Sequence, residues 1–181
     1  MRATIVLCLC LLLLPACSPI DYSAKDHLVK LADSRLAHDK LLLAPGWDEV
    51  SSRTTSENGK TSAVALFKGK DGGEQLGVLY EPVSVEAEPG SDDWIEWNRC
   101  DDQAFCDTVY TFFDAKSCAL VAYYMVPALH GRYVVSFSRG VQDDNVPCDA
   151  WENKDFFSER QEELYEDFLD RADQAFRPVA R

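Results

Sequence analysis

The stretch TSAVALFKGKDGGEQLGVLYEPVSV, residues 61–85, indicates the fold class. Its turn residues DGG, at positions 71–73, tolerate positive φ angles and separate two runs of strand-forming residues, so they predict a hairpin. The dipeptide NG at positions 58–59 is a second turn of this kind. The two turns together predict three strands, at Val50 to Ser56, Thr61 to Lys68 and Gln75 to Val85.

The downstream half of the chain continues the strand pattern. In the last run, Tyr133, Val135 and Phe137 alternate with more polar neighbours, as in a strand with one buried face. Three further strands are expected, at Thr108 to Phe113, Ser117 to Val126 and Arg132 to Ser138. The whole pattern predicts an antiparallel sheet of about six strands.

A helix is predicted at each end of the domain in sequence, before and after the strands. Near the start, residues 23–26 form a capping-box pattern, and Leu28, Ala32, Leu36 and Leu43 follow at helical spacing up to the stop at Pro45-Gly46. Alternatively, Leu41 to Leu43 begin a strand. A second helix is expected from Asn153 to Phe176. We therefore predict one α+β domain over residues 23–181, with the sheet covered by the two helices.

The first residues have the character of an export signal. Arg2 precedes twelve small or apolar residues, Ala3 to Leu14. Such a run spans about 18 Å as a helix at 1.5 Å per residue, which is too short for a hydrocarbon core of about 30 Å. Residues 1–16 are therefore interpreted as a cleaved signal peptide.

The end of this leader, LPAC at residues 14–17, resembles the lipobox of bacterial lipoproteins. The resemblance implies that Cys17 becomes the acylated, palmitate-bearing first residue, followed by a short tether over residues 17–22. In Gram-negative lipoproteins, a Ser after the lipidated Cys implies sorting to the outer membrane, facing the periplasm, and Ser18 has this place. The alternative is an ordinary secretory signal cut near Ala16, which leaves Cys17 as a free thiol.

Four cysteines remain in the body of the chain: Cys100, Cys106, Cys118 and Cys148. An even number in an oxidising compartment predicts two disulfides, and three connectivities are open. We favour Cys100 with Cys106 and Cys118 with Cys148. A zinc site is disfavoured because no Cys-x-x-Cys occurs and no His is near any of the four in sequence, so no metal or cofactor is predicted.

The charge balance bears on the class of partner. The formal net charge is −13, and removal of the leader makes it −14, with 17 basic and 31 acidic residues. Nucleic acid is disfavoured as a partner because phosphate binding needs a basic surface. A basic protein is the electrostatic complement, although the charge alone is also explained by solubility.

Two acidic segments are candidate binding surfaces. The first, Glu86 to Asp107, places Asp92 and Asp93 beside the aromatic residues Trp94 and Trp97, which alternatively close the core. In the second, acids recur at spacings of four and three along the terminal helix and stack into one ridge. This ridge is Glu159, Glu163, Glu166, Asp170 and Asp173, and its alternative reading is a solvated face.

No catalytic residue is assigned. His27 and His38, on the predicted first helix, are about 16 Å apart and cannot share a metal. His130 precedes Gly131 in a turn, without a serine elbow or a reactive-cysteine pattern. The acids Asp92, Asp93, Asp101 and Asp102 lack the ligand spacing of an EF-hand loop.

The last third of the chain, from GRYVVSF at residues 131–137 to AFRP at 175–178, is similar to the end of PsbP/Mog1-like domains. That resemblance suggests a fold but no activity. Our first functional hypothesis is an envelope-anchored, acidic protein-binding module of the inhibitor or immunity type. The second is an envelope-assembly or small-ligand-binding lipoprotein with a pocket between sheet and helices, and the third is an enzyme using His130.

Overall fold

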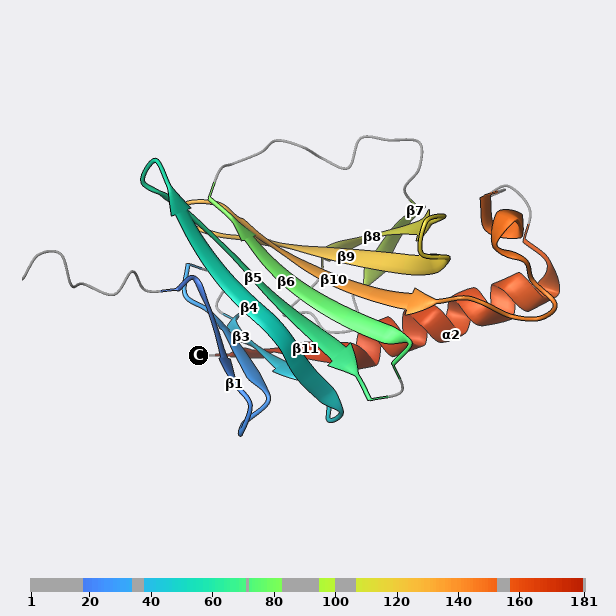
Figure 1. Ribbon diagram of the computed structural model, residues 1–181, viewed down its shortest axis with the longest axis horizontal. Helices are drawn as coiled ribbons and strands as arrows, with labels where there is room; N and C mark the ends of the chain where they lie inside the picture. Colours follow the sequence, from blue (N-terminus) through green and yellow to red (C-terminus); the bar gives the residue numbers. More distant parts are fainter. Residues whose placement is uncertain are drawn as a thin grey trace, which may run out of the picture.

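The computed structural model describes residues 18–33, 38–70, 72–82, 95–99, 107–152 and 157–180. These residues form two antiparallel sheets, of seven and four strands, with a C-terminal helix beside them (Figure 1). The predicted α+β fold, with a six-stranded sheet covered by a helix at each end, is therefore wrong. The fold is mostly β, and two strands, at Leu28–Leu31 and His38–Leu43, occupy the place of the predicted N-terminal helix.

The seven-stranded sheet is a long meander closed by one non-local pairing. Consecutive strands pair from β4 to β6 and from β7 to β10, while β6 pairs with β10 in the middle of the sheet. Its strands, in spatial order, are β4 (Trp47–Glu57), β5 (Lys60–Gly69), β6 (Glu74–Glu81), β10 (Arg132–Gly140), β9 (Ala119–Pro127), β8 (Asp107–Asp114) and β7 (Ile95–Arg99). Six of them lie where the turn pattern placed strands, and β7 was not predicted.

The register of the strands gives the central part of the large sheet one buried face. Phe137 of β10 lies opposite Leu76 of β6 and Ala122 of β9, and all three are inaccessible to solvent. The neighbouring positions on the same face, Tyr124 and Val135, are equally buried. Because side chains alternate along a strand, the residues between them lie on the opposite, more open face.

The four-stranded sheet corrects the helix predicted over residues 23–43. It is ordered β1 (Ile20–Ser23), β2 (Leu28–Leu31), β3 (His38–Leu43) and β11 (Phe176–Ala180). Val29 and Leu31, and likewise Leu41 and Leu43, are buried in alternation, which is the strand period and not the helical one. The predicted capping residues form the turn between β1 and β2, where the Ser23 hydroxyl donates to Asp26 at 2.9 Å.

The C-terminal helix α2 (Glu159–Ala175) is shorter at both ends than predicted. It begins at a capping box, in which the Ser158 hydroxyl accepts from the Gln161 backbone N–H and the Gln161 side chain accepts from that of Ser158. The short 3-10 helix η2 (Cys148–Glu152) precedes it. Phe176, expected as the last helical residue, instead begins β11, which pairs with β3.

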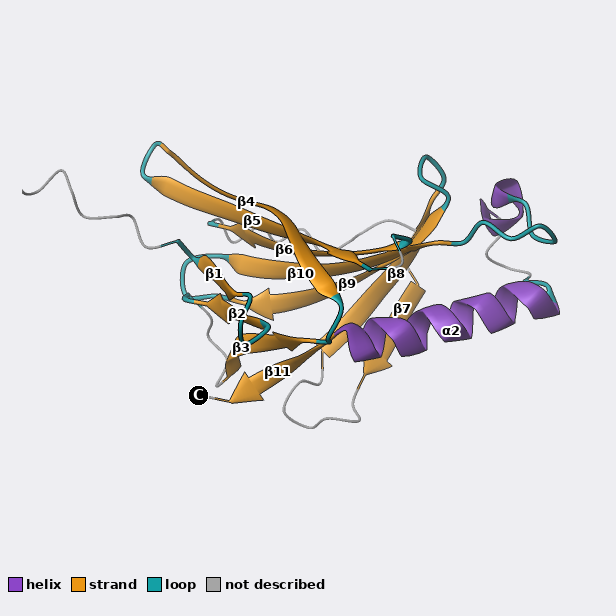
Figure 2. Cartoon of the chain, turned by 60° about the horizontal axis from the view of Figure 1, so that its bottom comes forward, coloured by secondary structure: helices purple, strands orange, loops and turns teal. Residues whose placement is uncertain are grey.

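Both the small sheet and α2 cover the buried face of the large sheet (Figures 1 and 2). Tyr22 of β1 packs edge-on against Phe67, with ring centroids 4.8 Å apart. Phe168 of α2 packs against Phe137 at 5.6 Å. Burial of such aromatic side chains contributes roughly 3–5 kcal/mol each, by the cost of replacing them with Ala, so these contacts hold the layers together.

One disulfide is present in the described part of the chain. It joins Cys118, in the turn between β8 and β9, to Cys148 at the start of η2, with their Cα atoms 5.6 Å apart. This is the pair favoured from the sequence. Cys100 and Cys106, the second predicted pair, lie outside the described residues.

Candidate functional site

The first predicted acidic segment falls mostly outside the described residues. Asp92, Asp93 and Trp94 are not among them, nor are Asp101 and Asp102. Trp97 lies in β7, where only its strand pairing with Val109 is described. The structure therefore provides no geometry for this part of the predicted partner-binding surface.

The second predicted surface is present on α2. Glu159, Glu163, Glu166 and Asp170 are exposed and lie on the side of the helix opposite the buried Phe168 and Ala172, as helical spacing requires. The fifth predicted residue, Asp173, differs from the others because it is half-buried, with one carboxylate oxygen enclosed. The ridge thus consists of four exposed carboxylates and one that is turned partly inward.

The two arginines of α2 are engaged with acids of neighbouring elements. Arg160 donates to Glu163 at 2.8 Å and also to Asp143, in the loop after β10, at 2.9 Å. Arg171 makes a bidentate pair with Glu74 at the start of β6, at 2.9 and 3.0 Å. Both arginines therefore tie the helix to the rest of the domain.

The charge of α2 is consequently far from balanced. The helix carries seven acidic residues and two arginines, a net charge of −5. Asp167 is paired with Arg139 of β10. Among the residues that the structure describes, no side-chain partner is found for four of the acids, which are Glu159, Glu162, Glu166 and Asp170. These four carboxylates face solvent.

The loop between β10 and α2 extends this surface. Its residues Asp144, Asp149 and Glu152 are exposed, and the loop packs on the beginning of α2 through Trp151, whose ring lies 5.5 Å from that of Phe157. The Gln161 amide also donates to the Ala150 carbonyl at 3.0 Å. We use the name acidic surface for these three residues together with Glu159, Glu162, Glu163, Glu166 and Asp170.

Sequence patterns did not predict that acids of this loop belong to the same surface as the helical ridge. Its acids precede the helix in sequence, and tertiary contacts bring them beside the helical ridge: the Trp151–Phe157 ring packing, the Gln161–Ala150 hydrogen bond and the Arg160–Asp143 ion pair. Arg160 lowers the pKa of the Asp143 carboxyl through their hydrogen bond, so Asp143 stays ionised well into the acid range. The loop is thereby held to α2 at any physiological pH.

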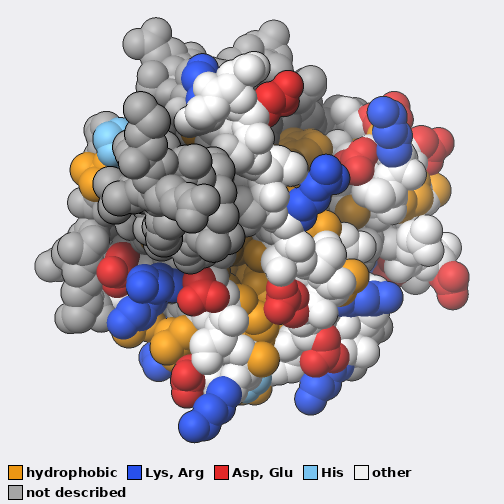
Figure 3. All heavy atoms as spheres, turned by 60° about the vertical axis from the view of Figure 1, so that its left-hand side comes forward, with side chains coloured by type: hydrophobic (Ala, Val, Ile, Leu, Met, Phe, Trp, Pro, Cys, Tyr) orange, Lys and Arg blue, Asp and Glu red, His pale blue; other side chains and the backbone are white. Residues whose placement is uncertain are grey.

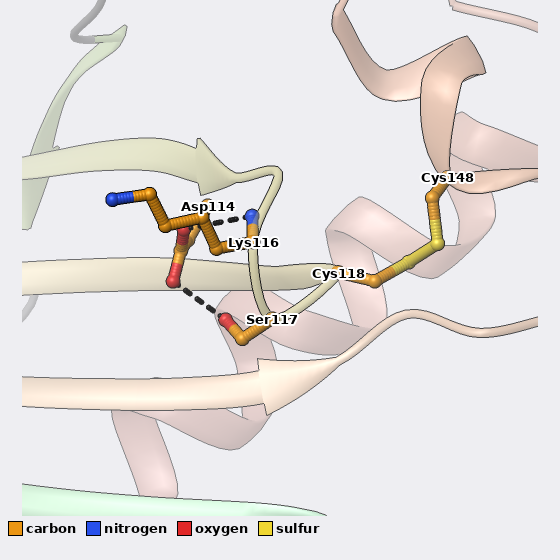
Figure 4. The surroundings of a disulfide bond; sticks show 5 residues. All are labelled: Asp114, Lys116, Ser117, Cys118 and Cys148. Carbon is orange, nitrogen blue, oxygen red and sulfur yellow. Dashed lines mark hydrogen bonds between the residues drawn. A yellow bond between two sulfur atoms is a disulfide. The ribbon is translucent and has the colours of Figure 1, made fainter.

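The disulfide fixes the other side of this loop (Figure 4). Cys118 is disulfide-bonded to Cys148, and the Cys118 carbonyl accepts a hydrogen bond from the Val141 N–H at 3.0 Å. The turn that carries Cys118 is itself ordered by Asp114, which accepts from the Ser117 hydroxyl at 2.6 Å and from the Lys116 N–H at 3.1 Å. The Ser117 hydrogen bond is the main reason that the pKa of Asp114 is lowered. Both ends of the loop that bears Asp143, Asp144 and Asp149 are therefore anchored.

A second polar cluster joins the two sheets at the end near Ser18. The Asp33 carboxylate, after β2, accepts from the Tyr80 hydroxyl at 2.6 Å and from the His130 backbone N–H at 2.9 Å. The Asp33 N–H donates to the Tyr133 hydroxyl at 3.0 Å, which donates to the Pro19 carbonyl at 2.8 Å. Burial raises the pKa of Tyr133 to about 12, and burial together with the Asp33 hydrogen bond raises that of Tyr80.

The three histidines do not form a catalytic or metal-binding group in the described structure. The imidazole of His130 is exposed, and its residue meets Asp33 through the backbone, so no imidazole–carboxylate dyad forms there. His27 lies in the β1–β2 turn at φ 53°, whereas His38 begins β3 at the opposite end of the small sheet. Within the described ranges no cluster of three or more His, Cys, Asp or Glu residues is arranged to hold a metal ion.

Two hollows on the described surface are large enough to be considered as ligand sites. The first has a volume of about 360 Å³ and lies between the β3–β4 turn and the end of α2, with the Arg171–Glu74 ion pair in its wall. The second, of about 720 Å³, lies on the open face of the large sheet beside the stacked rings of Phe112 and Tyr123, whose centroids are 5.4 Å apart.

Of the described helices, none combines the length and the apolar character required to cross a membrane.

Comparison with known proteins gives no relative from which a function could be transferred. No family model matches the chain, and no curated protein and no solved structure is significantly similar to it. The functional argument therefore depends on the residues themselves.

Proposed function

We propose that the protein is an envelope lipoprotein, anchored through acylated Cys17, whose acidic surface binds a basic protein in the manner of an inhibitor or immunity protein. The observation that carries this proposal is the charge of α2. Its arginines are committed to Asp143, Glu163 and Glu74, while four of its carboxylates face solvent without a partner in the described structure.

This arrangement suits electrostatic recognition of a protein. Like charges four residues apart destabilise a helix by a few tenths of a kcal/mol per pair, so the ridge weakens the isolated helix. A concentrated negative field raises the association rate with a basic partner, and it disfavours acidic ones. The two fixed ends of the 141–152 loop keep the carboxylates in place, which lowers the entropy lost on binding.

The second hypothesis, a small-ligand-binding or envelope-assembly lipoprotein, is supported by one feature. The 360 Å³ hollow between the sheets and α2 falls in the size range of small-molecule sites. Its lining is mixed, however, with Lys70, Glu74 and Arg171 around Trp47, whereas the hypothesis expects an apolar cavity. The third hypothesis, an enzyme using His130, has no supporting geometry among the described residues, because the His130 imidazole has no carboxylate beside it.

Charge reversal tests the proposal. Glu159, Glu166 and Asp170 are changed together to Lys, because these acids are exposed and take no part in the ion pairs that hold α2. The matched control changes three exposed acids of β1 and β4, Asp21, Glu49 and Glu57, to Lys and has the same net charge. Each protein is used to capture envelope proteins at low salt.

The proposal predicts that the unchanged protein and the control retain the same basic protein and that the α2 variant loses it. If the α2 variant retains it as well as the control does, or if nothing basic is retained by any of them, the proposed function is wrong. Lipidation is tested separately by the intact mass of the membrane-extracted protein and by Cys17→Ser, which should be recovered without membranes.

A further inference from the structure

The first described residues are bound directly to the folded domain. The Ser18 hydroxyl donates to the Ile20 carbonyl and lies 3.0 Å from the Thr54 hydroxyl of β4. The Pro19 carbonyl accepts from the Ala32 N–H at 3.0 Å and from the Tyr133 hydroxyl at 2.8 Å. Residues 18–22, assigned from the sequence to a tether, are thus attached to both sheets.

This attachment limits how far the domain can be from its anchor. Consecutive Cα atoms are about 3.8 Å apart, so Cys17 lies within one residue step of a position that is hydrogen-bonded to the domain. An acylated Cys17 has its chains in the bilayer. The end of the domain around Ser18 must therefore be at the membrane surface.

A rigid turn with an exposed leucine lies at the same end. Leu129 is 57% exposed, and its N–H donates to the Asp33 carbonyl at 2.8 Å, in the cluster that also binds Pro19. The turn is closed by a hydrogen bond from the Ala128 N–H to the Gly131 carbonyl at 3.1 Å. A Cβ at Gly131 would lie 2.0 Å from the Glu81 carbonyl, so the turn packs tightly on β6 and presents Leu129 in a fixed position.

Two of the acids at this end, Glu81 and Asp33, are neutralised within the protein, whereas Asp21 of β1 is exposed. Glu81 pairs with Arg132 at 2.6 Å, and the Asp33 carboxylate accepts two hydrogen bonds. Figure 3, in which the left-hand side of Figure 1 comes forward, shows basic and acidic side chains interspersed among the coloured atoms of this face. We use the name anchor end for Ser18, Pro19, Asp33 and the turn 128–131.

The acidic surface lies far from the anchor end. The last residue of β11 lies near the anchor end. Going back along the chain from there, the five residues of β11 and then α2 lead away from the anchor end along the long axis of the molecule (Figures 1 and 2). At about 3.3 Å per strand residue and 1.5 Å per helical residue, the α2 carboxylates are roughly 20–40 Å from that end. This exceeds the screening length of about 8 Å in physiological salt, so anionic lipids do not repel the α2 carboxylates in this orientation.

We propose that the anchor end docks against the bilayer that holds Cys17, with Leu129 in the headgroup region, and that α2 is thereby presented away from the membrane. This inference rests on the proposed lipidation of Cys17. It determines from which side a partner reaches the acidic surface. An apolar side chain on a membrane-docked surface is buried 5–10 Å into the headgroup boundary, which is a depth that fluorescence quenching detects.

Leu66 provides a matched control. It is also an exposed leucine, at 44%, but it lies at a different level along β6. Leu66 lies opposite Gly77 of β6, whereas Arg132, which is next to the turn that carries Leu129, lies opposite Glu81. Four residue steps along β6 separate the two levels, or about 14 Å at 3.4 Å per residue. Leu66 therefore stays outside the headgroup region when Leu129 is in it.

The experiment compares the full-length lipidated protein with its Leu129→Trp and Leu66→Trp variants in vesicles of phosphatidylethanolamine and phosphatidylglycerol. The signal is the fluorescence that each variant adds to that of the unchanged protein, with and without lipids brominated on their acyl chains. Circular dichroism verifies that each variant is folded. We expect the added fluorescence of Leu129→Trp to shift to the blue and to lose most of its intensity with brominated lipid, and that of Leu66→Trp to be unaffected.

Equal quenching of both variants, or no quenching of Leu129→Trp in protein that floats with the vesicles, overturns the inference and leaves the anchored binding protein intact. Protein that carries no acyl chains and does not float contradicts the lipidation itself, and the docked orientation is then refuted with it. Intact mass and flotation thus separate the two failures.

Discussion

Removal of the Cys118–Cys148 disulfide should destabilise the domain by about 4 kcal/mol. The two cysteines are 30 residues apart, and the loop that they close contains β9 and β10, the centre of the large sheet. The chain-entropy relation for a loop of this length gives a loss of about 12 cal/mol/K, or about 3.6 kcal/mol at 25 °C. For a domain of this size, that corresponds to a decrease in Tm of roughly 7–14 °C.

The variant for this test is Cys118→Ala with Cys148→Ala. Alanine is used because Cys118 is buried and a serine would place an unpaired hydroxyl there. The free energy of unfolding is measured by urea titration for the variant and for the oxidised wild type. The variant keeps the rest of the chain unchanged, so reduction at Cys100 and Cys106 does not contribute.

A difference below about 1 kcal/mol would refute the reasoning, since it would show that the loop is equally restricted in the unfolded chain without the bond. The variant should also bind the proposed basic partner more weakly. The loop carrying Asp143, Asp144 and Asp149 loses one of its two attachments, and additional entropy is then lost on binding.

Three further perturbations follow from single contacts. Gly131→Ala should cost more than 2 kcal/mol in urea unfolding, because its Cβ would lie 2.0 Å from a carbonyl oxygen, whereas Gly140→Ala, which meets nothing within 4 Å, should be nearly neutral. Tyr133→Phe should cost about 1–3 kcal/mol at pH 7 by leaving buried groups unpaired. Because folding raises the pKa of Tyr133 to about 12, the stability of the wild type is complete below pH 10 and decreases between pH 10 and 12, and the variant should show a smaller decrease in alkaline titrations. Ser158→Ala should lower the Tm by removing the α2 cap, worth about 1 kcal/mol, and Ser52→Ala on exposed β4 should not.

Six strands of the large sheet, all except β7, were predicted from sequence because their signals are local. The turns at 58–59 and 71–73 have φ values of 52°, 75° and 76° at Asn58, Gly59 and Gly72, as their residue types predict. The strands around them follow from alternation alone. The pairing of β6 with β10, by contrast, joins strands about 50 residues apart in sequence and does not follow from these local signals.

The small sheet was not accessible in the same way. Residues 23–26 suit both a helix start and a turn, since Ser and Asp side chains bond nearby backbone groups in either conformation. Leu28 to Leu43 contains helical and alternating spacings together. The pairing of β3 with β11 decides between them, and those strands are more than 130 residues apart in sequence. Tertiary contacts here override the local pattern.

In the candidate site, too, local sequence patterns predict one part and long-range contacts determine the rest. Spacings of four and three placed the carboxylates of α2 on one side of the helix without any structure. The partners of Arg160 and Arg171, by contrast, come from Asp143 and Glu74, and such long-range contacts leave no trace in helical spacing. These contacts determine which carboxylates remain available to a partner.

If the acidic surface binds the proposed basic protein through charge, the association rate of the captured protein depends on ionic strength. For the wild type and for the Asp21/Glu49/Glu57→Lys control, we expect a rate that falls about tenfold or more as salt rises from about 0.05 to 0.5 M. For Glu159/Glu166/Asp170→Lys we expect a slow rate with little dependence on salt. A wild-type rate that is independent of salt, or an identical salt dependence in all three proteins, would show that charge on α2 does not drive recognition.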